Sequence, residues 1–479
     1  MPQPAKHISH WIGGKPWAGG PPASRGELYN PATGRVSGTV DFASATEVGA
    51  AVDAAAAAFP GWRDSSLMKR AGVLFSFREL LRAHAAEIAA LISAEHGKVA
   101  SDAAGEVARG LEVVEFACGL PHLLKGGFSE NVSTGVDAYS IRQPLGVVAG
   151  ITPFNFPAMV PMWMFPLAIG CGNSFVLKPS EKDPSASLLL AELLAEAGLP
   201  DGVVNVVTGF GETTGAALAA HPDVDKVAFT GSTDVGKLIV HAAAGNLKKV
   251  SLELGGKSPN IVFEDAADSA IEGSANAIFF NHGQCCVAGS RLFVHQNRFD
   301  EVVGGVAEIA KAIKLGSGLE ASTQMGPMVS EEQFKRVNSF LESGKAEGAT
   351  ALAGGGTFGD RGFFIEPTVL INTHGNMKVV KEEIFGPVVV AEPFSDLDEI
   401  AAKANDTPFG LGAGIWTRDI SKAHALAKKL RAGSVYVNCY NVFDAALPFG
   451  GYKQSGWGRE MGHEVLNNYT EVKAVTTLL

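Results

Sequence analysis

The sequence is poor in cysteine and in charged residues, and it has no excess of positive charge. Its five cysteines are an odd number without CxxC spacing, which suits a reducing cytoplasm and excludes a disulfide scaffold or a cysteine-rich zinc site. Lysine and arginine number 39 against 50 aspartate and glutamate residues, whereas a nucleic-acid-binding protein normally shows a basic excess. We therefore expect a cytoplasmic protein that binds neither nucleic acid nor a metal ion.

Signals for secretion or for a membrane anchor are also lacking. The segment Met1–His7 is polar and has no apolar core of a signal peptide. The charge-free run Gln143–Leu177 has the hydropathy of a transmembrane candidate, but the four prolines from Pro153 to Pro166 would break a spanning helix. The run instead predicts a buried strand, a loop, a buried helix and a second strand, at residues 146–151, 153–157, 159–171 and 174–177.

The rest of the sequence shows the alternation of an α/β protein. Hydrophobic residues make up 46% of the 479 residues, which excludes a disordered chain and leaves room for two or three domains. Apolar positions at helical spacing predict helices over 44–118, and a hairpin is expected at 127–144. Strands and helices then alternate from 146 to 254, as in a doubly wound parallel sheet. A second α/β region extends to about residue 440, and the tail 465–479 is compatible with an added edge strand.

Three segments follow predicted strands, at the sheet edge where open α/β folds bind ligands. Lys178-Pro-Ser-Glu181 could reach ribose hydroxyls or phosphate, with a solvated turn as the alternative. Gly209-Phe-Gly211 nearly matches a dinucleotide-binding turn but has one residue too many before Gly215, so an ordinary tight turn is equally possible. The small residues of Phe229–Gly236 would let a nucleotide approach a helix N-terminus.

Two adjacent cysteines lie in the segment Gly283-Gln-Cys-Cys-Val-Ala-Gly289. Small neighbours would give a substrate access to a thiolate, which is an effective covalent nucleophile. A pair of buried structural cysteines is the alternative, and this segment alone does not decide between them. No G-x-S-x-G or H-E-x-x-H motif occurs, so a serine hydrolase or a zinc protease has no support.

Together these segments resemble the aldehyde dehydrogenase superfamily over nearly the whole chain. The resemblance rests on seven short motifs in the family's order, namely Pro153-Phe-Asn-Phe-Pro157, Lys178-Pro-Ser-Glu181, Phe229-Thr-Gly-Ser232, Leu252-Glu-Leu-Gly-Gly-Lys257, Gly283-Gln-Cys-Cys286, Glu383-Ile-Phe-Gly-Pro387 and Pro448-Phe-Gly-Gly451. It implies an α/β fold with a Rossmann-type nucleotide-binding domain (1–124 and 145–254), an α/β catalytic domain (255–461) and a β oligomerisation arm (125–144 and 462–479). Through this arm the subunits are expected to form a homodimer or homotetramer.

The resemblance also assigns catalytic roles. Cys286 matches the nucleophile that attacks an aldehyde to give a thiohemiacetal. Asn155 matches the side chain that stabilises the oxyanion, together with the Cys286 backbone N–H. Glu253 matches the general base that activates water to hydrolyse the resulting thioester. Because all three residues are present, a binding protein that has lost catalysis on this fold is disfavoured.

A nicotinamide cofactor and a hydrophobic tunnel are further implications of the resemblance. NAD is expected in preference to NADP, because Glu181 would bind the adenosine ribose hydroxyls and repel a 2′-phosphate. The residues that match cofactor contacts are Ile151, Thr152, Pro153, Phe154, Lys178, Ser180, Glu181, Gly209, Gly231, Ser232, Glu383 and Phe385. The residues that match the lining of the substrate tunnel are Phe156, Met159, Trp163, Phe443 and Phe449.

The two halves of the chain resemble different branches of the superfamily. Up to about Val207 the chain is similar to methylmalonate-semialdehyde dehydrogenases, and after Gly209 it is similar to hydrolytic enzymes of the phenylacetaldehyde dehydrogenase type. The semialdehyde branch lacks the glutamate at position 253 and has arginine where Gln284 stands, although Arg109 matches its carboxylate-binding arginine. We therefore expect oxidation of a hydrophobic or aromatic aldehyde to the free carboxylic acid, with a CoA-acylating methylmalonate-semialdehyde dehydrogenase as the alternative.

Overall fold

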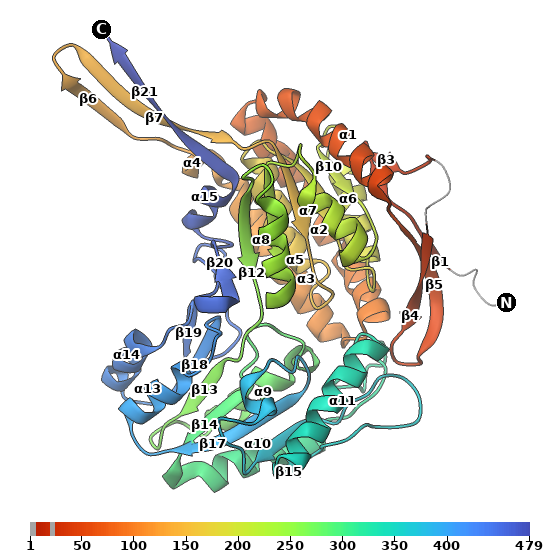
Figure 1. Cartoon of the computed structure of the whole chain (residues 1–479), viewed down its shortest axis with the longest axis vertical. Coiled ribbons are helices and arrows are strands. Elements are labelled where there is room, and N and C mark those ends of the chain that lie inside the picture. Colours follow the sequence, from red (N-terminus) through yellow and green to blue (C-terminus); the bar gives the residue numbers. More distant parts are fainter. Residues whose placement is uncertain (1–5, 20–23) are drawn as a thin grey trace.

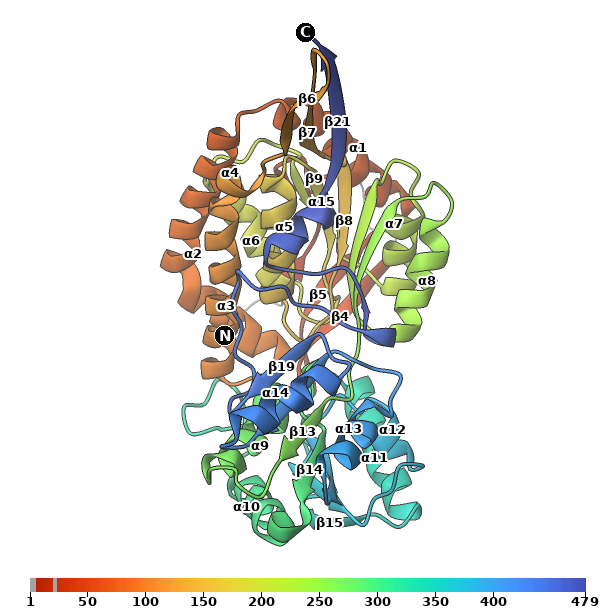
Figure 2. The same cartoon turned by 90° about the vertical axis from the view of Figure 1, so that its left-hand side faces the viewer.

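The computed structural model describes residues 6–19 and 24–479, so most of the segment Met1–His7 lies outside the described residues. Two α/β lobes lie one above the other, and a narrow β arm projects from the upper lobe (Figures 1 and 2). A small sheet at the side of the upper lobe contains β1 (Lys6–Ile8), β4 (Ser24–Asn30) and β5 (Arg35–Phe42).

Long helices form the first part of the upper lobe, as the apolar spacing predicts. They are α1 (Ala45–Arg63), α2 (Leu67–His96) and α3 (Ala100–Cys118), followed by the short α4 (Leu120–Leu123). Ser44 begins α1 with a capping box to Glu47, and the side chain of Ser66 caps α2. Gly97 ends α2 at a φ of 94°, a left-handed conformation that glycine adopts without steric cost.

An eight-stranded sheet forms the centre of the upper lobe. Its order is β20-β12-β11-β8-β9-β10-β2-β3, and the five strands from β12 to β10 are parallel. The strands are β2 (Trp11–Ile12), β3 (Lys15–Pro16), β8 (Val147–Ile151), β9 (Ser174–Lys178), β10 (Val204–Val206), β11 (Lys226–Thr230), β12 (Lys249–Glu253) and β20 (Gly456–Trp457). Because β20 pairs with β12, a segment of the predicted catalytic domain completes this sheet.

Helices cover both faces of this sheet. Helices α2, α3, α5 (Met159–Gly170) and α6 (Ser185–Glu196) pack on one face, and α1, α7 (Ala216–Ala220) and α8 (Thr233–Ala243) pack on the other. Strands β8 and β9 are buried at every position, as expected for a central parallel strand. The charge-free run therefore folds as β8, α5 and β9, and no helix among the described residues is long and apolar enough to span a bilayer.

The connections of this sheet reverse direction between β8 and β11. From β8 the chain passes through α5, β9 and α6 to β10 on one side, and it then returns to add β11 and β12 on the other side. Open α/β sheets bind ligands outside the carboxyl ends of their strands at such a switch point. Thr230 and Glu253 end β11 and β12 there.

The lower lobe contains a seven-stranded sheet with the order β15-β16-β17-β14-β13-β18-β19, parallel except for β15. Its strands are β13 (Pro259–Val262), β14 (Arg291–His295), β15 (Thr350–Ala353), β16 (Thr368–Ile371), β17 (Val388–Phe394), β18 (Gly412–Trp416) and β19 (Ser434–Val437). Helices α9 (Ser269–Phe279) and α10 (Phe299–Ala312) pack on one face. The other face is covered by α11 (Glu331–Ala346), α12 (Lys378–Lys381), α13 (Leu397–Asn405) and α14 (Ile420–Lys429).

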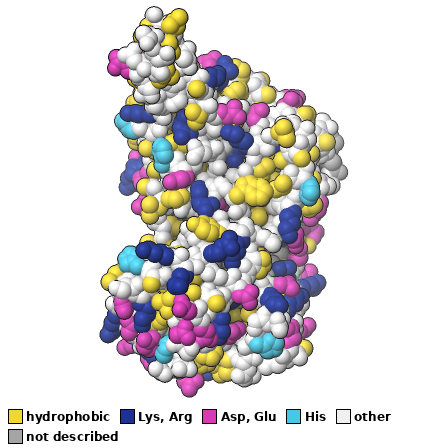
Figure 3. All heavy atoms as spheres, turned by 60° about the vertical axis from the view of Figure 1, so that its left-hand side comes forward, with side chains coloured by type: hydrophobic (Ala, Val, Ile, Leu, Met, Phe, Trp, Pro, Cys, Tyr) yellow, Lys and Arg dark blue, Asp and Glu magenta, His cyan; other side chains and the backbone are white. Residues whose placement is uncertain are grey.

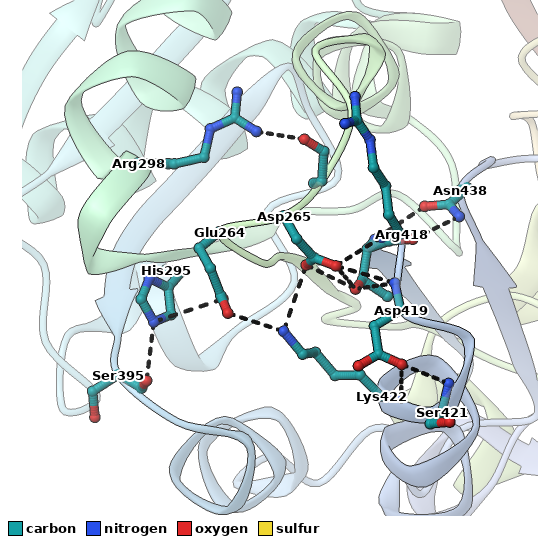
Figure 4. Close-up of polar contacts among 12 residues, drawn as sticks. Glu264, Asp265, His295, Arg298, Ser395, Arg418, Asp419, Ser421, Lys422 and Asn438 are labelled. Carbon is teal, nitrogen blue, oxygen red and sulfur yellow. Dashed lines mark hydrogen bonds and ion pairs between the residues drawn. The ribbon is translucent and has the colours of Figure 1, made fainter.

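A polar cluster at the end of β13 fixes the turn that leads into α14 (Figure 4). The Asp265 carboxylate accepts hydrogen bonds from the Thr417 hydroxyl at 2.8 Å and from two backbone N–H groups, those of Arg418 and Asp419, at 3.0 Å. Lys422 on α14 adds an ion pair with Glu264 at 3.0 Å. These acidic groups have partners inside the cluster, so we assign the cluster a structural role.

The arm is a three-stranded antiparallel sheet of β6 (Phe128–Ser133), β7 (Val136–Pro144) and β21 (Thr470–Leu478), and α15 (Leu466–Tyr469) precedes β21. Strand β21 pairs with β7 along its whole length, which confirms the expected hairpin and the added edge strand. Uncharged atoms dominate the arm on the face shown in Figure 3. The arm exposes four large apolar side chains, those of Phe128, Val132, Val472 and Leu478.

Candidate active site

A cavity of about 420 Å³ lies where the carboxyl ends of β11 and β12 face the loop after α9. The residues that line it come from distant parts of the chain, and they include Asn155, Phe156, Gly231, Glu253, Cys286, Glu383 and Phe449. The structure thus brings together the three predicted catalytic residues.

The two adjacent cysteines have different surroundings. Both line the cavity, but Cys285 is buried, whereas Cys286 is partly exposed. The neighbouring Cys285 thiol, burial and the carboxylates of Glu383 and Glu253 all raise the pKa of Cys286 well above its usual value. In the protein without ligands, Cys286 is therefore mainly a neutral thiol at pH 7. Its access to the cavity supports the choice of Cys286 as the nucleophile.

The backbone before these cysteines is tightly turned. Asn281 and His282 adopt φ values of 52° and 59°, in the left-handed region that residues other than glycine rarely occupy. Gly283 also has a positive φ, and a Cβ there would collide with the carbonyl oxygen of Gly386. This glycine of the Gly-Gln-Cys-Cys motif is therefore needed for the turn that directs Cys286 to the cavity.

Asn155 is buried next to the cysteine loop. Its side-chain Nδ2 donates to the carbonyl oxygen of Gln284 at 3.2 Å. An amide nitrogen carries two hydrogens, so the second remains available to an oxygen in the cavity. The contact holds the amide beside the loop that carries Cys286.

Glu253 ends β12 and is buried, and its Oε2 has no hydrogen-bond partner among the described residues. Burial raises its pKa well above the usual range, the carboxylate of Glu460 raises it further, and Arg459 opposes the shift. A Cβ on Gly450 would lie 2.7 Å from Glu253 Oε1. The Pro-Phe-Gly-Gly motif therefore leaves the space that this carboxyl group occupies.

Six of the predicted cofactor contacts line the cavity: Pro153, Phe154, Gly231, Ser232, Glu383 and Phe385. The Phe154 and Phe385 rings meet edge to face at 5.8 Å. Glu383 Oε1 accepts a hydrogen bond from the Gly256 backbone N–H at 2.9 Å, and burial raises the pKa of Glu383 to about 7.

The other six predicted cofactor contacts are not part of the cavity lining: Ile151, Thr152, Lys178, Ser180, Glu181 and Gly209. They lie at or just beyond the carboxyl ends of β8, β9 and β10. The buried Lys178 ammonium lies 3.5 Å from Glu181 Oε2, too far for a strong hydrogen bond. Thr152 Oγ1 is buried without a partner among the described residues. Side chains of these polar types can hydrogen-bond the hydroxyl groups of a ribose.

The five predicted substrate residues all line the cavity. Trp163, Phe443 and Phe449 form a triangle of edge-to-face aromatic contacts with ring centroids 5.2–5.9 Å apart. Phe156 stacks on Phe280 with its ring centroid 6.3 Å away. The arrangement gives one end of the cavity an aromatic wall.

Residues 17–475 match the sequence profile described as the aldehyde dehydrogenase family. The chain belongs to this family. It is 46% identical over 461 residues to the putative aldehyde dehydrogenase DhaS of Bacillus subtilis, with 95% of this chain and 93% of that protein covered. The NAD+ complex of an aldehyde dehydrogenase from Bacillus cereus is 43% identical, with a TM-score of 0.96 over 99% of this chain and 97% of that one. A mutant of the P. syringae AldA indole-3-acetaldehyde dehydrogenase, in complex with NAD+ and IAA, is 39% identical with a TM-score of 0.95, covering 98% and 96%.

The predicted α/β aldehyde dehydrogenase fold is confirmed by these likenesses. The cavity is also lined by residues to which sequence analysis assigned no role. Glu460 is buried beside Glu253, and burial raises its pKa to about 7 against the opposing effect of Lys226. Glu460 belongs to none of the seven motifs, so no signal in the sequence marked it. Gln333 and Arg336 on α11 also line the cavity and donate to the carbonyl oxygens of Phe385 and Glu383, at 2.7 and 2.9 Å.

Proposed function

We propose that the protein oxidises hydrophobic aldehydes, aromatic ones included, to free carboxylic acids with NAD as the cofactor. The observation that carries this proposal is one cavity that joins a partly exposed Cys286, the Asn155 amide and the Glu253 carboxyl group to an aromatic wall. A thiol, an oxyanion donor and a base are the groups that aldehyde oxidation through a thioester requires.

The first half of the reaction forms the thioester. Cys286 first loses its thiol proton to solvent water. The resulting thiolate attacks the carbonyl carbon, and the carbonyl oxygen becomes an oxyanion that accepts hydrogen bonds from the Asn155 amide and the Cys286 backbone N–H. When the oxyanion re-forms the carbonyl, the aldehyde hydrogen leaves with its electron pair. NAD, when bound, supplies the acceptor for that hydride. The product is a thioester on Cys286.

The second half hydrolyses the thioester. Glu253 removes a proton from a water molecule, the water oxygen attacks the thioester carbon, and the Cys286 thiolate leaves with the release of the acid. Burial and the carboxylate of Glu460 raise the pKa of Glu253 and so lower its ionised fraction at a given pH. Hydrolysis therefore depends on its ionised fraction.

The polar groups beyond β8 and β9 support NAD rather than NADP. Although burial favours the neutral acid, Lys178 and Lys182 lower the pKa of Glu181 below its usual value, so the carboxylate is ionised. An ionised carboxylate accepts hydrogen bonds from two ribose hydroxyls and repels a 2′-phosphate. The Bacillus cereus structure contains NAD+, which agrees with this choice.

The aromatic wall supports hydrophobic and aromatic substrates, and the P. syringae protein named for indole-3-acetaldehyde is a precedent within the family. One assay tests the whole proposal: NADH formation with phenylacetaldehyde and with methylmalonate semialdehyde, each with and without CoA. We expect faster turnover of phenylacetaldehyde, no need for CoA and a free acid as product. A requirement for CoA together with an acyl-CoA product would instead establish the CoA-acylating alternative.

Glu253→Gln gives a second test of hydrolysis. Thioester formation should continue without the base, so one equivalent of NADH per active site should appear before a slow steady state. CoA should not restore the steady-state rate. A fast steady state in this variant would remove Glu253 from the mechanism.

The proposal also covers the assembly of subunits and the roles of the two lobes. The exposed apolar side chains of the arm support its role in a homodimer or homotetramer. We assign nucleotide binding to the lobe around the eight-stranded sheet and catalysis to the lobe around the seven-stranded sheet.

A further inference from the structure

Three charged residues behind the cavity lie four positions apart along the start of α3. Lys98 precedes the helix, and Asp102 and Glu106 lie in its first two turns, so that all three share one face. The side chains of Lys98 and Glu106 are fully buried. None of the three lines the wall around Cys286, so the proposed reaction gives them no direct role.

Lys98 and Glu106 form an ion pair at 2.7 Å, and their remaining contacts converge on one short segment. The Lys98 ammonium donates to the carbonyl oxygen of Asn155 at 2.7 Å and lies 4.4 Å from the Phe156 ring centroid. The other oxygen of Glu106 accepts the backbone N–H groups of Ala158 and Met159 at 2.8 and 3.1 Å. The pair therefore holds the backbone at Asn155 and again three residues later.

Asp102 makes a similar contact to the loop that carries Cys285 and Cys286. Its Oδ2 accepts the backbone N–H of Asn281 at 3.2 Å, where the strained turn before Gly283 begins. The Asn281 side chain in turn donates to the carbonyl oxygens of Asn155 and Gln284, at 3.1 and 2.8 Å. One helix face thus holds both loops that meet at the oxyanion site.

We propose that Lys98 and Glu106 are positioning residues that fix the Asn155 amide relative to Cys286. The inference rests on the proposed function, in which Asn155 stabilises the oxyanion. Asn155 lies in a segment without helix or strand between β8 and α5, so regular backbone hydrogen bonds do not hold it. A buried ion pair is a poor source of stability, but its fixed geometry suits this task. A displacement of about 1 Å in a reacting group can cost roughly 100-fold in rate.

A double-mutant cycle tests this inference. The measured quantity is the rate of NADH formation in a single turnover with enzyme in excess, for Glu106→Gln in the wild-type and the Asn155→Ala backgrounds. We expect Glu106→Gln to slow the wild-type enzyme about 10- to 100-fold. In the Asn155→Ala background the same change should cost less than about 3-fold, because a residue that acts through Asn155 has nothing left to position.

Two controls separate positioning from a general loss of structure. Glu112→Gln changes an exposed glutamate on the same helix and should alter the rate by less than about 2-fold. The dissociation constant for NAD, measured by titration, should stay within about 2-fold of the wild-type value in Glu106→Gln, because the contacts of this pair are to Asn155–Met159. If Glu106→Gln does not fold, Lys98→Met/Glu106→Gln takes its place in the cycle, because it leaves no unpaired buried charge.

The outcomes distinguish this inference from the proposed function. Equal slowing by Glu106→Gln in both backgrounds would overturn the positioning role and leave the role of Asn155 intact. An unchanged rate in Asn155→Ala alone would remove Asn155 from the mechanism, and the inference would fall with it.

Discussion

Cys285 and Cys286 are neighbours in the sequence, but their surroundings give the two thiols different access to a substrate. Cys285 packs into the core, while Cys286 faces the cavity next to Asn155 and Glu253. We expect Cys286→Ala to lower NADH formation by at least about 1,000-fold, because no other nucleophile is in place to form the thioester. Cys285→Ala should keep most of the activity. Steady-state assays of both variants check this, and loss of activity in Cys285→Ala alone would reverse the assignment.

The buried carboxyl group of Glu460 should control the pH dependence of hydrolysis. A raised pKa means that Glu253 becomes a base only as the pH rises, so thioester hydrolysis should accelerate with pH in the wild type. Because the carboxylate of Glu460 contributes to that raised pKa, Glu460→Gln should lower it. The rising limb of the rate of hydrolysis should then move to lower pH.

The measurement for Glu460→Gln is the steady-state rate against pH under conditions in which hydrolysis limits turnover. Glu464→Gln is a matched control, since Glu464 is exposed and lies four residues away. Its profile should coincide with that of the wild type. A rising limb that stays in place or moves to higher pH in Glu460→Gln would contradict the influence of Glu460 on Glu253.

At the scale of single residues, the functional residues that could be predicted from the sequence are those in recognisable local motifs. Cys286, Asn155 and Glu253 lie in short segments whose order along the chain resembles a family, so their convergence could be expected. Glu460 and Arg336 lie outside such segments, and their roles depend on which distant side chain packs beside them. The raised pKa of the Cys286 thiol could not be predicted for the same reason. It depends on the neighbouring Cys285 thiol, burial and nearby carboxylates, whose arrangement is a property of the folded chain.

Among the structural elements, the turn after β9 has the clearest consequence for cofactor choice. Glu181 lies between Lys178 and Lys182, which pair with it at 3.5 Å each. Replacing the carboxylate by an amide removes repulsion of a 2′-phosphate and leaves Lys178 without its acidic partner, although Lys182 keeps Glu332 at 3.0 Å. Glu181→Gln should therefore raise the ratio of kcat/KM for NADP to that for NAD by roughly tenfold.

The ratio is measured with both cofactors at a saturating aldehyde concentration. Glu196→Gln is the control, because Glu196 is exposed at the end of α6 and carries the same charge. This control should leave the ratio unchanged. A wild-type enzyme that prefers NADP, or an unchanged ratio in Glu181→Gln, would contradict the role given to Glu181.

The helices and central strands were predictable because their signals are local. Four prolines and the lack of charge in Gln143–Leu177 predicted two buried strands around a helix, and β8, α5 and β9 follow that pattern. The short strands β2, β3 and β20 could not be predicted, because two residues carry no periodicity. Strand β2 adds to the edge of the sheet at β10, β3 pairs with β2, and β20 adds to the edge at β12.

At the scale of the whole molecule, the arm is the candidate contact between subunits. Val472 on β21 is 60% exposed, and the arm also exposes Phe128, Val132 and Leu478, a grouping of apolar side chains that is typical of an interaction surface. Val472→Asp should weaken association at least about tenfold and lower the mass measured by light scattering. Leu319→Asp is the control, at a residue 56% exposed in the lower lobe, and it should leave the mass unchanged. A wild-type monomer would contradict the assembly.

The pairing of β21 with β7 also sets an order of events during protein synthesis. Arg142 on β7 contacts Thr470 on β21, although the two residues are 328 positions apart in the chain. The ribosome therefore completes both lobes before the arm can acquire its third strand. Until then β7 keeps one edge unpaired. If the arm joins subunits as proposed, a newly made subunit becomes able to associate only after its catalytic residues have been translated.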